Sequence, residues 1–280
     1  MKSTLAPYKE FLALAAVVVL TVIIAYAVQR YLPSAVKKPW RTIDDIPVEW
    51  EVKFKDRAVK FLAFDANILE DENIAEAVET IRYRLISNMP ETPYDIEVIV
   101  VESPVANAVT FPGGLIAVFT PLIRLCDTPE ELAAVLAHEI GHVVKRDPLQ
   151  RFIRQVGISA VFALFKGGES TVLLEDAIRQ LIEVRYTQKQ EEEADRFALK
   201  LLADSGIDPA NFAAFMEKLS DGGDDATEGV NKYLRTHPPV SDRIAKACKA
   251  SEEFGQQQKP FALDWNAVRT SLPSVFASRK

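Results

Sequence analysis

The sequence has few cysteines and histidines and no excess of basic side chains. Only two cysteines, Cys126 and Cys248, occur among 280 residues. They are too few and too far apart for a disulfide scaffold or a Cys-rich zinc module, although a single disulfide stays open. The net charge of −7 and the pI of about 5.2 argue against a nucleic-acid partner. Because 48% of the residues are hydrophobic, the chain can form a sizeable core, and disorder or a collagen-like repeat is excluded.

One long hydrophobic run stands near the N-terminus. From Phe11 to Val28 the chain has 18 residues without a charge, and such a helix is roughly 27 Å long against a hydrocarbon core of about 30 Å. We predict that residues 1–30 form a transmembrane anchor that contacts the lipid bilayer. Two alternatives stay open: a cleaved signal peptide, since Ala25-Tyr26-Ala27 fits a cleavage site, and a buried core helix.

The membrane face is less clear from the sequence. Cations after the hydrophobic run, Lys37, Lys38 and Arg41 among them, favour a cytoplasmic domain, whereas the signal-like character of the run favours export. We predict a single-pass protein of the bacterial inner membrane or an equivalent membrane, with the periplasmic side preferred.

The rest of the chain reads as one domain with a linker and a tail. Residues 31–48 contain three prolines and are predicted to be a linker, 49–250 the folded domain, and 251–280 a tail with a short helix around Trp265. Apolar residues at helical spacing predict a helix between Asp71 and Asn88.

The predicted fold is α+β and mainly α. A β-branched run from Ile96 to Val101 and an apolar run from Leu115 to Thr120, which follows the turn Pro112-Gly113-Gly114, predict a small sheet with a hairpin. Beyond Thr128 the pattern is almost wholly helical.

A metal-binding pattern lies on the first of these later helices. Thr128-Pro129-Glu130-Glu131 has the residues of a helix start. The array His138-Glu139-Ile140-Gly141-His142 follows, and histidines four apart share one helix face, so both can bind one zinc ion while Glu139 acts as general base. The alternative is a surface helix that contains two histidines by chance.

A third ligand must come from elsewhere in the chain. The continuation H-x-x-G-x-x-H is absent after His142, which excludes a third histidine from this helix. Glu191 and Asp195 share one face of a later helix, so Glu191 is a candidate ligand and Asp195 a candidate acceptor for the far nitrogen of a zinc-bound histidine. The alternative is a solvated acidic helix face.

The remaining histidine, His237, precedes Pro238 and Pro239. It is a candidate for stabilising an oxyanion or for occupying the open zinc position as an inhibitory ligand, and Arg243 is a candidate for orienting it or binding substrate backbone. A turn histidine without a catalytic role is the alternative.

Together these residues resemble the HtpX/BepA-like family of membrane-associated gluzincin metalloendopeptidases, which also includes CAAX prenyl proteases and a mitochondrial inner-membrane stress protease. The resemblance covers roughly residues 70–245, and four segments carry it: 107–114, the HExxH helix from Glu131 to His142, Glu191-x-x-Ala194-Asp195, and Thr236-His237-Pro238. It implies that the domain 49–250 is a zincin-like zinc metalloprotease domain that holds one zinc ion through His138, His142 and Glu191, with Glu139 as base and Asp195 behind a ligand.

The resemblance also implies where substrate binds. The segment from Asn107 onward would form an edge strand and turn beside the cleft, which makes Asn107, Ala108, Gly113 and Gly114 candidate substrate-binding residues, and the position of His237 is associated in relatives with a gate over the zinc. An extended peptide can add to such an edge through backbone hydrogen bonds. Two departures, Val109-Thr110-Phe111 and Asp147, are expected to alter substrate fit without contacting a ligand.

The predicted function is zinc-dependent hydrolysis of peptide bonds in misfolded or membrane and envelope proteins, with His237 or Tyr186 stabilising the oxyanion. Its partners are polypeptide substrates and the bilayer. A chaperone-like binding module for unfolded envelope proteins with a gated or inactive zinc site is the main alternative, and a soluble aminopeptidase is a third hypothesis.

Overall fold

The computed structural model describes residues 43–65, 68–158, 161, 171–183, 185–221, 233, 236–237, 241–255 and 257–273. The chain divides into two compact units between Ile46 and Pro47. Of the first unit only residues 43–46 are described, and they contain the 3-10 helix η1 (Ile43–Asp45). The predicted anchor, Phe11–Val28, lies outside the described residues. Within them, no helix has the length and apolar character needed to span a bilayer.

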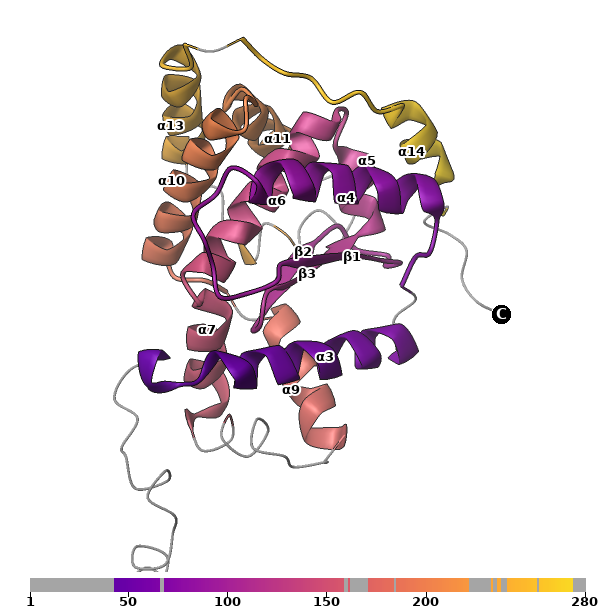
Figure 1. The fold of residues 1–280 in the computed structure, drawn as a ribbon, viewed down its shortest axis with the longest axis vertical. Coiled ribbons are helices and arrows are strands. Elements are labelled where there is room, and N and C mark those ends of the chain that lie inside the picture. Colours follow the sequence, from indigo (N-terminus) through magenta and orange to yellow (C-terminus); the bar gives the residue numbers. More distant parts are fainter. Residues whose placement is uncertain are drawn as a thin grey trace, which may run out of the picture. The chain divides into compact units, whose positions relative to one another are not determined.

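The second unit is mainly helical with one small sheet, as predicted (Figure 1). Its elements, in chain order, are α3 (Val48–Asp65), α4 (Glu72–Ile86), β1 (Glu97–Val101), β2 (Ala108–Phe111), β3 (Leu115–Phe119), α5 (Thr120–Leu125), α6 (Pro129–Val144), α7 (Asp147–Val156), α9 (Thr171–Glu183), α10 (Gln188–Asp204), α11 (Ala210–Asp221), α13 (Ser241–Glu252) and α14 (Trp265–Ser271).

Side-chain caps explain where the main helices begin. The side chain of Asp71 accepts a hydrogen bond from the backbone of Ile74 at the start of α4, and Thr128 accepts one from Glu131 at the start of α6. Thr187 and Gln190 form a reciprocal capping box at the start of α10. Because these caps satisfy N–H groups that have no partner inside the helix, they fix the first turns of the two helices that carry the metal-binding pattern.

The sheet has the strand order β1-β3-β2, with β1 parallel and β2 antiparallel to β3. The two predicted strands and the hairpin are therefore confirmed. The turn between β2 and β3 needs glycine, because Gly113 and Gly114 have φ of +90° and +89°. A side chain at Gly113 would also collide with the backbone carbonyl of Glu51 in α3.

The central strand β3 is buried along its whole length, because helices cover both faces of the sheet. Ile116 and Val118 belong to the main hydrophobic cluster, which also contains apolar residues of α4 and α6. In Figure 1, α4 and α6 lie on one side of the sheet, and α3 and α9 on the other. The sheet thus serves as the support against which α6 is held.

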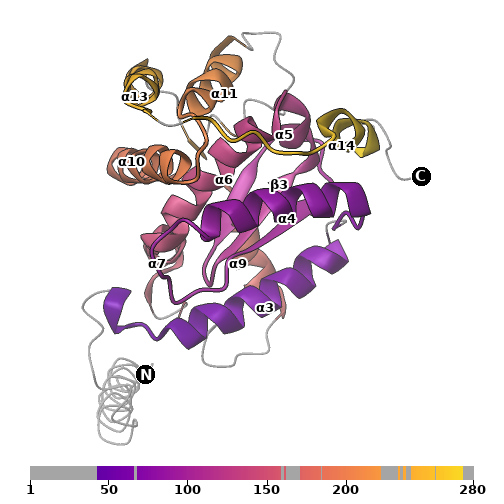
Figure 2. The ribbon, with the colours of Figure 1, turned by 45° about the horizontal axis from the view of Figure 1, so that its top comes forward.

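Helices α10, α11 and α13 gather on one side of α6 in both views (Figures 1 and 2). The C-terminal segment then passes back across the molecule to α14, the predicted short helix around Trp265 (Figure 2). Both cysteines are free: Cys126 is buried and Cys248 is exposed, so the disulfide left open by the sequence does not form.

Candidate metal centre

The helix that carries the His138 to His142 pattern is a central helix rather than a surface one. Every residue of α6 from Pro129 to Val143 is buried. This burial excludes the alternative of a surface helix with two chance histidines. Gly141 faces Ala194 of α10, and a Cβ on Gly141 would lie only 3.0 Å from the Ala194 Cα. The absent side chain lets the two helices approach closely.

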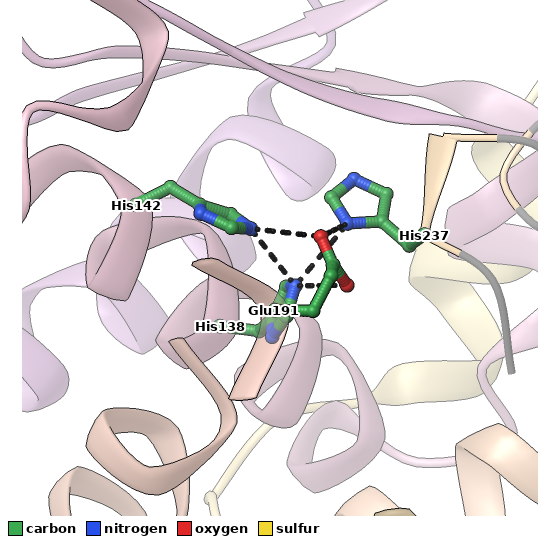
Figure 3. Close-up of side chains that lie close together, drawn as sticks. All are labelled: His138, His142, Glu191 and His237. Carbon is green, nitrogen blue, oxygen red and sulfur yellow. Dashed lines mark hydrogen bonds and ion pairs between the residues drawn. The ribbon is translucent and has the colours of Figure 1, made fainter. Parts of the chain in front are cut away.

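This approach brings four side chains together (Figure 3). His138 and His142 come from α6, Glu191 from the first turn of α10, and His237 from the segment before α13. One ligand atom from each lies within 4.8 Å of all the others, and all four residues are buried. The pattern predicted from sequence therefore closes into one cluster in space.

The distances in the cluster fit a tetrahedral ion. The Nε2 atoms of His138 and His142 are 3.2 Å apart, and the Glu191 carboxylate lies 3.4 Å from the latter and 3.6 Å from the former. Zinc bound at about 2.0–2.1 Å in a tetrahedron separates its ligand atoms by roughly 3.4 Å. Two imidazole nitrogens and one carboxylate are also a donor set that zinc favours.

His237 stands as a fourth donor. Its Nδ1 lies 2.9 Å from Glu191 Oε1 and 3.3 Å from His138 Nε2. The backbone N–H of His237 donates to the carbonyl of Tyr233, whose ring stacks on the imidazole with centroids 4.7 Å apart. The turn and the ring together aim Nδ1 at the centre of the cluster.

The outer nitrogens of both α6 histidines face carboxylates. His138 Nδ1 lies 2.9 Å from Asp195 Oδ1, and His142 Nδ1 lies 2.9 Å from Asp147 Oδ2. A carboxylate at Nδ1 keeps the proton on that nitrogen and leaves Nε2 free as a metal ligand. The expectation that Asp147 contacts no ligand was wrong, because the turn after α6 brings it back against His142.

Arg243 binds two carboxylates of α10, those of Asp195 and Glu191. Its Nε and Nη2 each donate to Asp195 at 2.7 Å, and its Nη1 lies 3.2 Å from Glu191 Oε2. The side chain is almost fully buried. In this arrangement Arg243 fixes the carboxylate plane of Asp195, while its predicted roles toward His237 and substrate backbone stay predictions.

Glu139 points into the same space from α6. Thr110 Oγ1 of β2 donates to Glu139 Oε2 at 2.5 Å, and His237 Nε2 lies 3.5 Å from Glu139 Oε1. Burial opposes ionisation of this carboxyl, yet the imidazoles of His237, His138 and His142 outweigh it and hold its pKa below the ordinary value. Glu139 is therefore held as a carboxylate, the form a general base requires.

The two α6 histidines differ in their electrostatics: burial holds the pKa of His138 below its ordinary value, whereas the carboxylates around His142 favour its charged form. Burial disfavours the imidazolium of His142, but Asp147 and Glu191 together raise its pKa to about 9. Burial likewise opposes ionisation of Glu191, and His237 and His142 nevertheless hold its pKa well below the ordinary range. A buried group of carboxylates with this preference for a cation fits a divalent metal ion.

The predicted substrate residues lie in two places. Asn107 and Ala108 are at the start of the edge strand β2, where Asn107 Oδ1 accepts from the backbone N–H of Ala108. Gly113 and Gly114 lie in the turn beyond β2, against Glu51 of α3 and Tyr94, and are not part of the metal cluster. Their roles in substrate binding stay predictions.

Three contributors had no role, or another role, in the sequence interpretation. Thr110 was noted only as a departure from the family pattern, and Gln190 was not singled out, although its spacing from Thr187 is that of a capping box. Tyr186 was named for its hydroxyl, whereas its ring stacks on His142 with centroids 3.7 Å apart.

The sequence of this chain matches a known family of peptidases. Residues 69–251 match the model of Peptidase family M48. The chain belongs to this family. M48 peptidases are zinc metalloproteases, and the cluster of His138, His142, Glu191 and His237 could hold such a metal ion in this chain.

Similar M48 proteins come from bacteria and mitochondria. The chain is 30% identical over 213 residues to the "Beta-barrel assembly-enhancing protease" of Escherichia coli (strain K12). This match covers 70% of the chain and 43% of that protein. The chain is 33% identical over 155 residues to the "Mitochondrial metalloendopeptidase OMA1" of Arabidopsis thaliana (55% and 31%), and 30% identical over 152 residues to the "Metalloprotease LoiP" of Escherichia coli (52% and 59%). The chain thus spans less than half the length of the first two relatives.

Proposed function

We propose that this M48 protein is a zinc-dependent metalloendopeptidase, anchored in a membrane by residues 11–28, that hydrolyses misfolded or membrane and envelope proteins. The observation that carries the proposal is the buried set of His138, His142 and Glu191 at zinc-ligand spacing, with Glu139 beside it. Two of the relatives are named beta-barrel assembly-enhancing protease and mitochondrial metalloendopeptidase, and these names support a protein substrate.

His138, His142 and Glu191 would hold the metal. When bound, zinc lowers the pKa of a water ligand toward about 7 and polarises the scissile carbonyl. Glu139 takes a proton from the attacking water and passes it to the leaving nitrogen, and the hydroxyl of Thr110 holds the Glu139 carboxylate in position for both transfers. Asp195 and Asp147 keep the two imidazoles in the metal-binding tautomer.

The metal is tested by measuring the zinc content of the purified full chain and of Glu191→Ala. We expect about one zinc per chain in the parent and clearly less in the variant, because one of three anionic or imidazole donors is lost. A folded parent that takes up no zinc when it is supplied would refute the metalloprotease proposal.

The chemistry is tested by Glu139→Gln. Glutamine keeps the shape of the side chain but cannot accept the proton, so we expect zinc content to be unchanged and hydrolysis of an unfolded protein substrate to fall by roughly 10²–10⁴-fold. Equal turnover by the two proteins would remove Glu139 from this role.

The position of His237 favours a second candidate, a chaperone-like module whose zinc site is closed. Its Nδ1 lies where a fourth metal ligand would stand. In a catalytic zinc site this fourth position must be open for water or substrate. We infer that His237 restrains the protease and expect His237→Ala to raise hydrolysis while zinc content is kept. A fall in activity would instead assign His237 to oxyanion stabilisation.

The chaperone-like candidate is tested with Glu139→Gln. If this variant still prevents the aggregation of an unfolded protein, binding rather than hydrolysis carries the function.

A further inference from the structure

Helix α7 begins directly after α6, the helix that carries His138 and His142. Arg146, between α6 and α7, has a φ of +55°, a left-handed conformation that turns the chain back on itself. Its guanidinium is held by Glu51 of α3, with Nη2 2.6 Å from Glu51 Oε1. This turn places Asp147, the first residue of α7, against His142 only five residues earlier.

Both carboxylate oxygens of Asp147 have hydrogen-bond partners. It is only 2% exposed, and while Oδ2 faces His142, Oδ1 accepts a hydrogen bond from Gln190 Nε2 at 2.8 Å. The Gln190 oxygen in turn accepts from the backbone of Thr187 and from Arg154. The capping box of α10, whose next residue is the ligand Glu191, therefore also fixes the carboxylate behind His142.

The face of the His142 ring is held as well as its edge. The ring of Tyr186 is nearly parallel to the imidazole, with an angle of 7° and a centroid distance of 3.7 Å. The guanidinium of Arg151, one turn along α7 from Asp147, lies 4.2 Å from the Tyr186 ring centroid. The Tyr186 hydroxyl is buried and has no hydrogen-bond partner among the described residues, so the ring and not the hydroxyl makes the contact.

We propose that Asp147 and Tyr186 form a clamp that fixes the tautomer and the plane of His142, with Gln190 and Arg151 supporting it. His138 is oriented separately, by Asp195. The clamp presupposes the metal centre of the proposed function and adds positioning residues to it. Such partners behind a metal ligand change metal affinity by about 10- to 100-fold when they are lost.

A purely structural role for Asp147 is the competing explanation, because an acidic residue in the first turn also stabilises a helix. The two explanations differ in what they predict for the metal-free protein. A helix-stabilising role lowers stability with or without metal, whereas the clamp acts on the geometry of His142 and therefore on metal binding.

The test uses the full chain with Asp147→Asn, Tyr186→Leu and Tyr186→Phe. Three quantities are measured: the zinc dissociation constant by chelator competition, the visible spectrum of the Co²⁺-substituted protein, and urea unfolding without metal. We expect Asp147→Asn and Tyr186→Leu to weaken zinc binding by about 10- to 100-fold and to change the Co²⁺ spectrum, whereas Tyr186→Phe, which keeps the ring, matches the parent.

Zinc binding by Asp147→Asn at parental affinity would overturn the clamp, and so would a loss that Tyr186→Phe shares with Tyr186→Leu, since the hydroxyl would then carry the effect. A parent that binds no zinc would overturn the metal centre itself, so the two failures are distinguishable.

The pair Asp147 and Gln190 also allows a rescue. In Asp147→Asn combined with Gln190→Glu, the new amide can accept from His142 and donate to the new carboxylate, which can still accept from Thr187. We expect the double variant to regain part of the affinity lost by Asp147→Asn. A loss of zinc affinity in the double variant equal to the sum of the losses in Asp147→Asn and Gln190→Glu would contradict the shared network. This comparison holds even where Asp147→Asn lowers stability.

Discussion

Thr110 is the residue that links the sheet to Glu139, the proposed general base. Its hydroxyl donates to Glu139, and its backbone carbonyl accepts from Arg151 of α7 at 3.3 Å. It is fully buried in the edge strand β2. Thr110 therefore connects β2, the strand predicted to receive substrate, with the proposed general base Glu139 and with helix α7.

Thr110→Val keeps the size of the side chain but removes this donor. A hydrogen bond to a charged group contributes about 1.5–3 kcal/mol, so we expect kcat to fall roughly 10- to 100-fold while zinc content is unchanged. Thr110→Ser, which keeps the hydroxyl, is the matched control. If both variants lose activity equally, packing in β2 and not the hydrogen bond is responsible.

At this scale the sequence predicted the groups whose spacing is local. His138 and His142 share a face by helical period alone, and Glu191 and Asp195 do the same. Asp147 escaped because its contact depends on the left-handed turn at Arg146, which is held by Glu51 of a distant helix. A contact set by tertiary packing leaves no local pattern.

Among the elements, α6 is the one on which the site depends. It is buried from Pro129 to Val143, so its neighbours pack against it on all sides. Its start is fixed by the side chain of Thr128, 3.3 Å from the backbone nitrogen of Glu131. The cap therefore fixes where the helix that carries His138 and His142 begins.

Thr128→Ala should destabilise the metal-free protein by about 1 kcal/mol, because an orphan N–H at the helix start loses its partner. Urea unfolding followed by circular dichroism measures this loss, and Thr128→Ser serves as the control that keeps the cap. Equal unfolding midpoints for the alanine variant and the parent would show that the cap contributes nothing here.

The sequence predicted α4, α6, α10 and the hairpin, because each has its own periodicity, cap or turn residues. It gave no prediction for α3, which begins at Val48, the last residue of the predicted linker. Its buried Phe54, Ala58 and Leu62 recur at intervals of four, a helical signal that was present but not used. The parallel pairing of β1 with β3 could not be read from either strand, since it joins segments separated by β2.

On the scale of the whole molecule, the C-terminal segment closes the domain beyond the part matched by the family. Phe261 and Trp265 are buried in the main cluster, and the indole of Trp265 donates to the carbonyl of Cys126 at 2.9 Å. The backbone N–H of Phe261 donates to Glu130, in the first turn of α6. The tail thus covers the start of α6. The sequence interpretation assigned no function to this tail.

Trp265→Ala should cost about 3–5 kcal/mol of unfolding free energy, because it removes a large buried side chain and its hydrogen bond. Chemical denaturation measures the cost, and Asn266→Ala at the exposed neighbouring position provides the control. A tryptophan variant as stable as the control would mean that the tail is only loosely attached.

The contact of Gly141 with Ala194 has a consequence for ion selection. Where two helices meet backbone to backbone, no side chain between them can rearrange, so the gap that separates the imidazoles from Glu191 is as rigid as the helices themselves. Calcium needs six to eight oxygen ligands at about 2.3–2.6 Å. If His138, His142, Glu191 and His237 hold an ion, a site fixed at this spacing would disfavour such a large, hard cation by its size as well as by its mainly nitrogen donors.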